Sequence, residues 1–459
     1  MNNRHSVDMT KGGIFRPIIM FAIPLMLTGM LQMLYNAADM IVVGRFMGKT
    51  AGKNALAAIG STSSAIGLVV NLFIGLSSAA CVIVARKFGA KNHEGVSKAV
   101  HTAIALAITG GIMLCIVGVS IAYPLMKLMG SPDEVINLAT LYMRIYFCGC
   151  PAIMIYNFGS AILRAIGDTK RPFYYLLLAG TINVILNLIT VIIFKLGVAG
   201  VGIATVTSQV VSAILVVRCL IRTNESYKLC IRKIRFFKNE LLEILYLGIP
   251  AGIQGTVFPI SNIIIQSSIN AVGSIAMAGN AAAVAVEGIV YTSMNAYHHA
   301  TLTFISQNYG AFKFDRIKKG LAAGLVSVVA TGVILGGLVC LFPEELITFY
   351  SKVPEVIACG STRIRYINSL YFLCGMMDVC NAGMRGLGAS LSPMLITIVG
   401  VCGLRNIIVI FGGPYKELHD LIILYISYWY SWGITALILF IGFVILFKKK
   451  RAEYTATTR

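Results

Sequence analysis

Five polar side chains recur at helical spacing within an otherwise apolar stretch near the N-terminus. Four of them follow at steps of four, four and three residues, which places them on one helical face, and a tyrosine lies beside them. They are Thr28, Gln32, Asn36 and Asp39, with Tyr35 as the tyrosine. A carboxylate among amide and hydroxyl oxygens can bind a hard cation such as sodium, or it can carry a proton. A simpler interpretation is that Asp39 only marks the outer end of its helix.

A second group of polar side chains lies in two later apolar stretches of the same half of the chain. One face of the first stretch carries Asn183, Asn187 and Thr190. The following stretch adds four hydroxyl and amide groups: Thr205, Ser208, Gln209 and Ser212. Isolated Asn and Ser residues more often join helices through hydrogen bonds. Because three polar rows occur together here, we expect them to converge with Asp39 on one cation site.

The C-terminal half carries a different polar row, whose members are spaced by seven, four, four and three residues and share one face. They are Asn280, Glu287, Tyr291, Asn295 and His298. Glu287 is the only acidic residue of that long apolar stretch, so it requires a partner, a cavity or a proton. We expect His298 and the adjacent His299 to pack or to form hydrogen bonds, because no set of metal ligands accompanies them.

A third row, farther along, stacks Asp378, Asn381 and Arg385 on one face. A carboxylate in the middle of a bilayer costs roughly 2.5 to 3.5 kcal/mol on insertion scales unless it faces protein or water. Arg405 is a candidate counter-charge, so Asp378 is either part of a functional cavity or half of a buried ion pair. The candidate cavity residues of this half are therefore Glu287, Tyr291, Asn295, Asp378 and Arg405.

The elements that carry these residues must be membrane helices. The chain has 57% apolar and 12% charged residues and a mean hydropathy of +0.82, which a water-soluble domain could not accommodate. Its apolar runs are too long for membrane strands and do not alternate, so we predict an all-α integral membrane protein. The twelve predicted spans are 14–42, 55–84, 97–123, 135–160, 171–194, 198–221, 239–270, 275–308, 316–342, 356–383, 393–412 and 420–447.

The net charge of +20 reflects membrane topology. Of the 38 Lys and Arg residues, 27 fall at the two ends of the chain and in alternate connections, and seven fall in the opposite connections. This asymmetry predicts that the protein lies in the inner (plasma) membrane of the cell with both termini in the cytoplasm. The basic side then faces the anionic lipid of the inner leaflet. A nucleic-acid-binding role is excluded. The first apolar run is too long for a cleaved signal peptide, and the eleven cysteines, mostly within apolar runs, are expected to be packing residues.

The two halves of the chain repeat each other. Ile23-Pro24, Gly29 and Asn36 recur 226 residues later, and further along the chain matches recur at a constant offset of 221. Those matches pair Gly67, Gly89-Ala90, Glu134-Val135-Ile136, Arg144, Arg164, Gly167 and Pro172 with Gly288, Gly310-Ala311, Glu355-Val356-Ile357, Arg365, Arg385, Gly388 and Pro393. Since each half holds an even number of spans, we predict two pseudo-symmetric six-helix lobes related by an axis along the membrane normal. The predicted domains are an N-lobe (1–217), a cytoplasmic linker (218–240), a C-lobe (241–447) and a basic tail (448–459).

These residues resemble the multidrug and toxic compound extrusion (MATE) family, within the wider multidrug/oligosaccharidyl-lipid/polysaccharide flippase superfamily. The resemblance covers nearly the whole chain. It rests on the Ile-Pro pair of each half, the run Tyr35-Asn36-x-x-Asp39 ending in Val43-Gly44, and the Arg-x-x-Gly segments before Pro172 and Pro393. It implies two lobes that form a V, and export of amphipathic, often cationic compounds in exchange for sodium or protons.

By this resemblance Asp39 corresponds to the family's first-helix carboxylate and Pro24 to a hinge. The surrounding N-lobe cation site would consist of Gln32, Tyr35, Asn183, Asn187 and Thr205. Two positions depart from the family pattern. Archaeal-type members carry a second aspartate where this chain has Asn187, and one bacterial branch places a sodium-binding glutamate where this chain has Phe258.

The sequence therefore predicts a monomeric antiporter that uses alternating access, with amphipathic small molecules and membrane lipids as partners. The coupling ion is a proton or sodium, and no cofactor is expected. The alternative is a flippase for lipid-linked oligosaccharides or cell-wall precursors, whose anionic head groups would need cavity arginines. The candidates are Arg144, Arg363, Arg365 and Arg405. An enzyme or channel is disfavoured, because no nucleophile elbow, phosphate loop or metal set is present.

Overall fold

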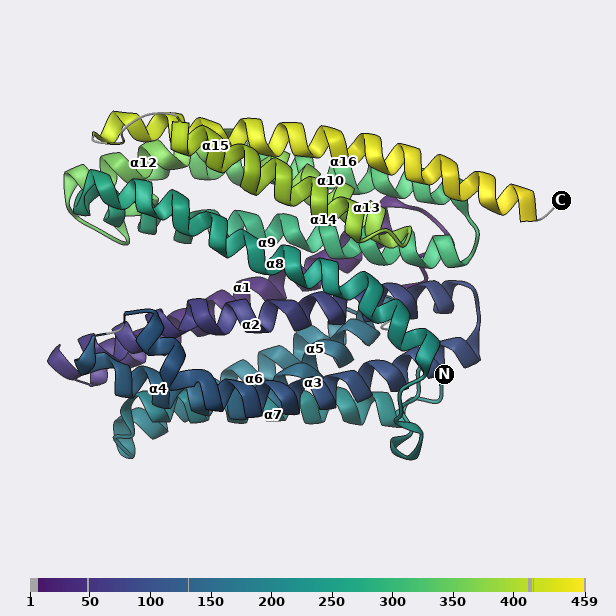
Figure 1. Ribbon diagram of the computed structural model, residues 1–459, viewed down its shortest axis with the longest axis horizontal. Coiled ribbons are helices and arrows are strands. Elements are labelled where there is room, and N and C mark those ends of the chain that lie inside the picture. Colours follow the sequence, from purple (N-terminus) through teal and green to yellow (C-terminus); the bar gives the residue numbers. More distant parts are fainter. Residues whose placement is uncertain (1–6, 48, 131, 412–414, 416, 458–459) are drawn as a thin grey trace. The chain divides into compact units, whose positions relative to one another are not determined.

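The computed structural model describes residues 7–47, 49–130, 132–411, 415 and 417–457, and within them it contains helices and no strand (Figure 1). The predicted all-α class is confirmed. The first six residues of the predicted N-lobe and residues 458–459 of the predicted tail lie outside the described residues. The helices are α1 (Phe15–Phe46), α2 (Lys49–Gly89), α3 (His93–Leu128), α4 (Asp133–Cys148), α5 (Cys150–Ala165), α6 (Lys170–Leu188), η1 (Ile189–Ile193), α7 (Gly197–Arg222), η2 (Ile231–Lys233), α8 (Lys238–Val272), α9 (Ser274–Gly310), α10 (Phe314–Leu341), α11 (Pro343–Thr348), α12 (Pro354–Ser369), α13 (Phe372–Gly386), α14 (Leu391–Thr397), η3 (Ile398–Gly403), α15 (Leu404–Phe411), η4 (Leu418–Asp420) and α16 (Leu421–Thr457).

Ten helical stretches of the described chain are long and apolar enough to cross a membrane, and the bent pair α4 and α5 adds an eleventh. The chain is therefore a multi-pass membrane protein. The bend between α4 and α5 is 48° and lies at Gly149. Pro151 follows at the start of α5, where its missing N–H leaves no helical hydrogen bond unmade.

The predicted span 356–383 is divided between α12 and α13, which have 16 and 15 residues. Neither is long enough to cross a hydrocarbon core of about 30 Å alone. α12 also carries Arg363 and Arg365, so its composition is less apolar than that of the other helices. The count of twelve spans stays a prediction, which treats α12 and α13 together as one span.

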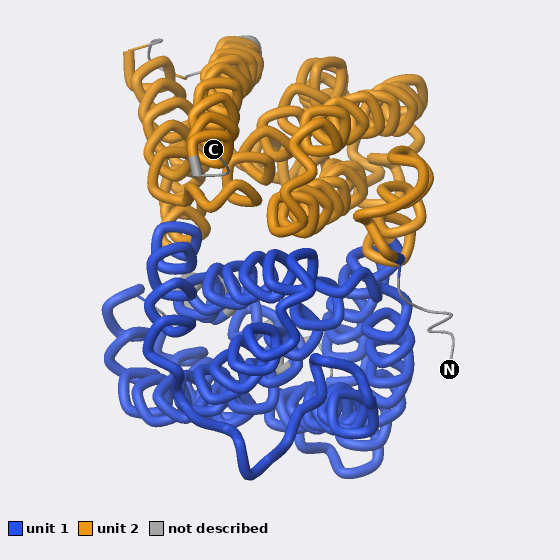
Figure 2. The backbone as a smooth tube through the Cα atoms, turned by 90° about the vertical axis from the view of Figure 1, so that its right-hand side faces the viewer, with its two compact units in different colours: residues 1–7, 27–252 blue, residues 8–26, 253–459 orange. Residues whose placement is uncertain are grey.

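Packing divides the chain into two compact units (Figure 2). Unit 1 includes Leu27–Gly252, and unit 2 includes Asp8–Met26 and the described residues from Ile253 onward. Two helices therefore belong partly to each unit. The division falls two residues after Pro24 in α1 and two residues after Pro250 in α8. A proline inside a helix removes one backbone hydrogen bond and crowds the preceding turn, so each helix is weakened next to the division between the units.

Unusual backbone conformations recur at the offset of the sequence repeat. Gly167 and Gly388, 221 residues apart, have φ angles of 90° and 91°. Lys91 and Phe312, also 221 residues apart, both have φ of 55°. Each pair lies just after the end of a helix, where a residue in the left-handed region stops helical hydrogen bonding. The same helix endings are thus used in both halves of the chain.

Within unit 1, α2 and α8 approach closely at a pair of glycines. A Cβ atom added to Gly75 would lie 2.2 Å from the backbone nitrogen of Gly252, and one added to Gly252 would lie 2.5 Å from the carbonyl oxygen of Leu72. Small residues at membrane helix interfaces allow such backbone approach, and van der Waals packing then stabilises the pair. The obstacle to any side chain here is backbone, which cannot move aside as a flexible side chain can.

We expect Gly75→Val to separate α2 from α8 and destabilise unit 1 by at least the roughly 1 to 3 kcal/mol of an overpacked core. A thermal unfolding scan of the purified protein in detergent measures this as a lower transition temperature. Gly67→Val is the matched control on the same helix, because a Cβ at Gly67 would meet nothing within 4 Å. Equal transition temperatures for the two variants would contradict the assigned contact.

The predicted linker 218–240 is held against α3 by hydrogen bonds. The backbone N–H of Cys230 donates to Nε2 of His101 at 3.0 Å, and that of Phe237 donates to Oγ1 of Thr102 at 3.2 Å. His101 and Thr102 are buried, so the linker is a fixed part of unit 1.

In unit 2, one arginine fixes the segment that precedes α1. The guanidinium of Arg316 donates to five acceptors: the carbonyl oxygens of Met9 (3.0 Å), Lys11 (3.2 Å), Gly12 (2.7 Å) and Gly13 (3.4 Å), and Oδ1 of Asn308 (3.0 Å). These bonds tie the start of α1 to the corner between α9 and α10.

Candidate functional site

A polar cavity of about 220 Å³ lies within unit 1 between α1, α6 and α7. Its lining combines carboxyl, amide and hydroxyl groups from all three helices. The lining residues are Gln32, Tyr35, Asn36, Asp39, Leu176, Ala179, Gly180, Asn183, Thr205, Ser208 and Gln209. The structure thus brings five of the six predicted N-lobe residues to one cavity. The sixth, Asn187, contacts it through Asp39.

Asp39 lies in the interior of the site. Its side chain is 9% exposed, and α1 continues beyond it to Phe46, so Asp39 does not mark a helix end. Asn187 donates one N–H to the carboxylate of Asp39 and another to Oδ1 of Asn183 at 3.3 Å. Asn183 in turn lies 3.5 Å from the hydroxyl of Thr205. Within the described residues, no ion pair includes Asp39, so its neighbours offer dipoles and no balancing charge.

Two buried acceptor atoms of the site lack donors. Among the described residues, nothing donates a hydrogen bond to Oδ1 of Asn187 or to Oε1 of Gln209. A buried polar atom without a partner is costly, and such atoms are uncommon in native structures. Both are oxygens; Gln209 lines the cavity together with Asp39, and Asn187 contacts Asp39 through its amide N–H.

Three predicted hydroxyl groups are engaged by their own helices. Thr190 donates to the carbonyl of Leu186 at 2.8 Å, Ser212 donates to that of Ser208 at 3.2 Å, and Ser208 donates to that of Thr205 at 2.8 Å. Each hydroxyl oxygen keeps its lone pairs as acceptors. Of the three, only Ser208 lines the cavity.

Local features of α6 shape the cavity wall. A Cβ atom at Gly180 would lie 1.8 Å from a ring carbon of Tyr35, so only glycine leaves room for that ring. The hydroxyl of Tyr35 donates to the carbonyl of Leu177 at 3.2 Å. Directly after Leu188, the helix widens into the π-helical turn η1, a feature that is frequent at functional sites.

In unit 2, Glu287 has a charged partner. Arg363 of α12 donates from Nε and Nη2 to the two carboxylate oxygens of Glu287, both at 2.9 Å. Its third nitrogen donates to Oδ1 of Asn280 at 3.0 Å, and Tyr425 donates to the same oxygen at 3.1 Å. The side chains of Glu287 and Arg363 are 8% and 5% exposed. Of the three options that the sequence left open for Glu287, the structure supplies a partner.

Asp378 lies in a separate polar cluster of unit 2. Its backbone carbonyl contacts Nδ1 of His298 at 2.9 Å, as expected for a hydrogen-bonded histidine. Asn295 and Arg385 are polar neighbours of its carboxylate. Tyr291 lies 3.5 Å from Asn295 on the same face of α9.

Arg405 contacts aromatic rings. Its guanidinium lies 3.9 Å from the ring centre of Tyr428 and 5.5 Å from that of Trp432, and it donates to the hydroxyl of Ser431 at 3.2 and 3.1 Å. Within the described residues it forms no ion pair with Asp378. The structure does not show the expected counter-charge at this position.

Sequence reasoning missed Arg363 as the partner of Glu287 and Gly180 as the residue that accommodates Tyr35. The signal for the first was present, since Arg363 is one of four basic residues within or at the edge of a predicted span. No signal in a single sequence pairs Gly180 with Tyr35.

A protein-family model described as MatE matches residues 24–189 and 250–411, well over half of the chain. This chain belongs to the MatE family. The resemblance inferred from the sequence is confirmed. The two matched stretches of this MatE protein begin at Pro24 and Pro250, the two prolines that lie next to the division between the units.

Curated relatives of this MatE protein cover most of its length. The probable multidrug resistance protein YoeA of Bacillus subtilis is 26% identical over 449 residues, which are 96% of each chain. The probable multidrug resistance protein NorM of Thermotoga maritima is 25% identical over 84% of this chain and 83% of its own. A FAD transporter of Shewanella oneidensis is 24% identical over 88% of each chain.

Solved structures share the MatE fold. A multidrug resistance MATE family transporter in an outward-facing conformation has a TM-score of 0.90 at 20% identity, over 98% of this chain and 100% of its own. A MATE transporter in a straight conformation has a TM-score of 0.89 at 21% identity, over 97% and 98%. At this level of identity the likeness establishes the fold.

The structure shows what surrounds the two positions at which the sequence departs from the pattern implied by the resemblance, Asn187 and Phe258. Asn187 donates to Asp39, and Asp39 is the one carboxylate among the residues that line the cavity. Phe258 packs against the apolar core of unit 2. In unit 2, the carboxylates within the polar rows predicted from the sequence are those of Glu287 and Asp378, and both have polar neighbours.

Proposed function

We propose that this chain exports amphipathic, cationic small molecules in exchange for protons or sodium ions, and that Asp39 is the exchange site. The observation that carries the proposal is the buried carboxylate of Asp39 in a polar cavity without an ion-pair partner among the described residues. The names of the relatives support this substrate class, since several are multidrug resistance or multidrug export proteins.

The chemistry of the site suits a small cation. A buried carboxylate is unfavourable when charged and unpaired, so it gains free energy from a proton, a sodium ion or a cationic substrate. Sodium would be held by Asp39 with the acceptor oxygens of Asn183, Thr205 and Gln209, while Asn187 donates to the carboxylate. Gln32 and Tyr35 complete the wall. A proton would need only the carboxylate.

Transport follows if the two ligands favour opposite states. The coupling ion and the exported compound must each bind one of the inward- and outward-facing states more tightly, because a ligand without such a difference shifts no equilibrium. One charge moving through 100 mV supplies about 2.3 kcal/mol, which is enough for roughly 50-fold accumulation. The proposal is alternating access, with Pro24 as a hinge at the point where α1 passes from unit 2 to unit 1.

The proposed architecture is twelve spans in two pseudo-symmetric lobes, with both termini in the cytoplasm and the protein as a monomer in the plasma membrane. The recurrence of helix endings at the 221-residue offset supports the repeat. In the C-lobe we assign Asp378, with Tyr291 and Asn295, as the second candidate ion site. Glu287 and Arg405 take structural roles in this proposal, because Glu287 is paired and Arg405 is stacked on aromatic rings.

A lipid-linked oligosaccharide flippase has less support. Such a protein needs cationic groups free to bind an anionic head group. Arg363 is paired with Glu287, and Arg365 with Glu344 at 3.1 Å. The polar cavity of unit 1 contains the carboxylate of Asp39, which would repel an anionic head group.

The test is transport by purified protein in liposomes, with a panel of organic cations and separately imposed sodium and pH gradients. We expect uptake or efflux of several panel members to be driven by one of the two gradients. The flippase would be favoured if no organic cation of the panel were transported. It would also be favoured if a polyprenyl-phosphate sugar were transported with no response to either gradient.

A further inference from the structure

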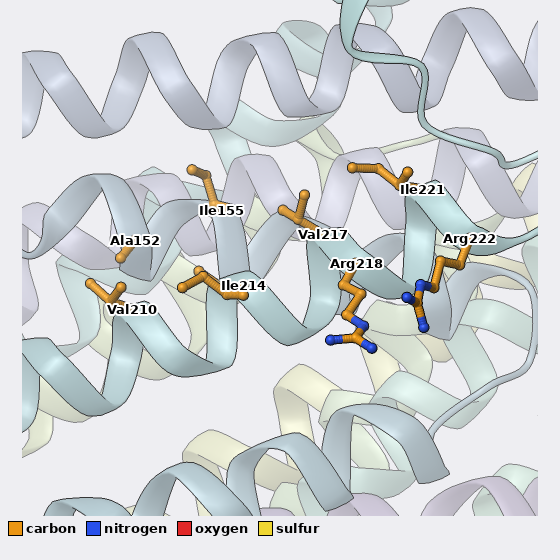
Figure 3. A pocket seen from close by; sticks show the side chains of 9 residues that line it. Ala152, Ile155, Val210, Ile214, Val217, Arg218, Ile221 and Arg222 are labelled. Atoms are coloured by element: carbon orange, nitrogen blue, oxygen red, sulfur yellow. The ribbon is translucent and has the colours of Figure 1, made fainter.

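An apolar groove with two arginines at one end lies on unit 1 between α5 and α7 (Figure 3). We call it the α5–α7 groove. It has a volume of about 500 Å³. The apolar wall consists of Ala152 and Ile155 from α5 and of Val210, Ala213, Ile214, Val217 and Ile221 from α7. The arginines are Arg218 and Arg222, one helical turn apart in the last turns of α7.

The groove lies between two close contacts of α5 with α7, one at Gly149, directly before α5, and one at Gly159. A Cβ at Gly159 would lie 2.1 Å from Val216, and one at Gly149 would lie 2.6 Å from Val206, so no larger residue fits at either contact. Between these contacts, Ala152 lines the groove with only a methyl group. Ile214 on its rim is 60% exposed, which shows that the groove opens to the surroundings.

The arginine end of the groove has an excess of positive charge. Arg218 and Arg222 are exposed, and among the described residues neither has an acidic partner. The carboxylate of Asp168 is already paired with Arg171 at 3.3 Å. Arg171 contacts the sulfur of Cys219 and does not line the groove, so the ion pair leaves the charges of Arg218 and Arg222 unbalanced.

We propose that the α5–α7 groove binds an anionic phospholipid, with an acyl chain along the apolar wall and the phosphate between Arg218 and Arg222. The predicted topology places the end of α7 at the cytoplasmic leaflet, where anionic lipids gather. A cationic drug would be repelled by the arginines. A free phosphate would gain nothing from the apolar wall. The proposal does not depend on the proposed transport function.

Basic side chains at a helix end also attract anionic lipid without any site, simply as part of the positive-inside pattern. The groove makes a stronger claim, because head group and acyl chain must be accommodated together. Blocking the apolar part should therefore weaken binding although both arginines remain. That consequence separates a binding site from a diffuse charge effect.

The experiment is native mass spectrometry of the delipidated full-length protein titrated with palmitoyl-oleoyl phosphatidylglycerol or phosphatidylcholine. We expect tighter binding of phosphatidylglycerol, and the double substitution Arg218→Gln with Arg222→Gln should weaken it by about 25-fold, at about fivefold per arginine. Ala152→Phe should weaken the binding of both lipids. Each variant must elute as one symmetric size-exclusion peak.

The charge-matched control is Arg232→Gln with Lys233→Gln, which removes two exposed cations from the linker outside the groove. It should leave phosphatidylglycerol binding unchanged within about twofold. Equal affinity of the wild type for the two lipids would overturn the proposal. So would an equal loss in the linker control, or full binding by Ala152→Phe.

Discussion

Asp39→Asn is expected to abolish ion-driven efflux from proteoliposomes while the protein remains folded. The substitution keeps the size of the side chain and its ability to accept from Asn187, but it removes the charge that a proton or sodium ion would neutralise. Since the cavity contains no other carboxylate, nothing else in its lining replaces that charge. Gradient-driven transport of an organic cation, compared with the wild type at equal protein content, measures the effect.

The control for this substitution is Asp133→Asn, at the exposed start of α4 in the same unit. It removes one carboxylate far from the cavity lining and should keep wild-type transport. Normal gradient-driven transport by Asp39→Asn, with the thermal transition unchanged, would contradict the role of Asp39. A loss in both variants would show that the assay responds to net charge.

Glu287→Gln is expected to destabilise unit 2 by about 3 to 5 kcal/mol, because it leaves the buried guanidinium of Arg363 without its counter-charge. Removing both charges together should recover most of that loss, so the double variant with Arg363→Met is expected to be far more stable than Glu287→Gln alone. Thermal unfolding in detergent measures the difference. The double-mutant comparison isolates the pair from the separate effect of each side chain.

Glu344→Gln is the matched control, because it breaks an exposed ion pair. The side chains of Glu344 and Arg365 are 62% and 58% exposed. An exposed pair contributes at most about 1 kcal/mol, so its loss should be barely measurable. If Glu287→Gln retained wild-type stability but lost coupled transport, Glu287 would be an ion site and the structural assignment would be wrong.

Much of unit 1 could be predicted from sequence because helical period fixes which side chains share a face. The steps of three and four from Gln32 to Asp39 needed only that period, and so did the shared face of Asn183 and Asn187. Their convergence required a further step, which the number of polar rows and the family resemblance supplied. The cavity lining agrees with that expectation.

The C-terminal half was harder to predict, because period alone does not say which helix faces which. The sequence indicates that Glu287 needs a partner, a cavity or a proton, but it does not identify Arg363, which the fold brings to Glu287 by packing α12 against α9. The sequence offers Arg405 as a candidate counter-charge for Asp378, whereas its guanidinium lies over the ring of Tyr428. An aromatic ring can hold a cation through its quadrupole, and the sequence offers no rule that prefers this to an ion pair.

The breaks within helices could not be predicted from the sequence either. The span 356–383 is divided at residues 370–371 into α12 and α13, although neither residue is a glycine or a proline that would mark a break. The π-helical turns η1 and η3 insert an extra residue into a continuous apolar run. Both look like ordinary helix in a hydropathy pattern.

The most direct measurement of the central claim is the release of a bound ion by substrate. Purified protein, loaded with protons in a weakly buffered solution or with radioactive sodium, is mixed with saturating tetraphenylphosphonium. We predict that the wild type releases about one proton or one sodium ion per molecule and that Asp39→Asn releases neither. Equal release from both proteins would show that the exchanged ion does not reside at Asp39.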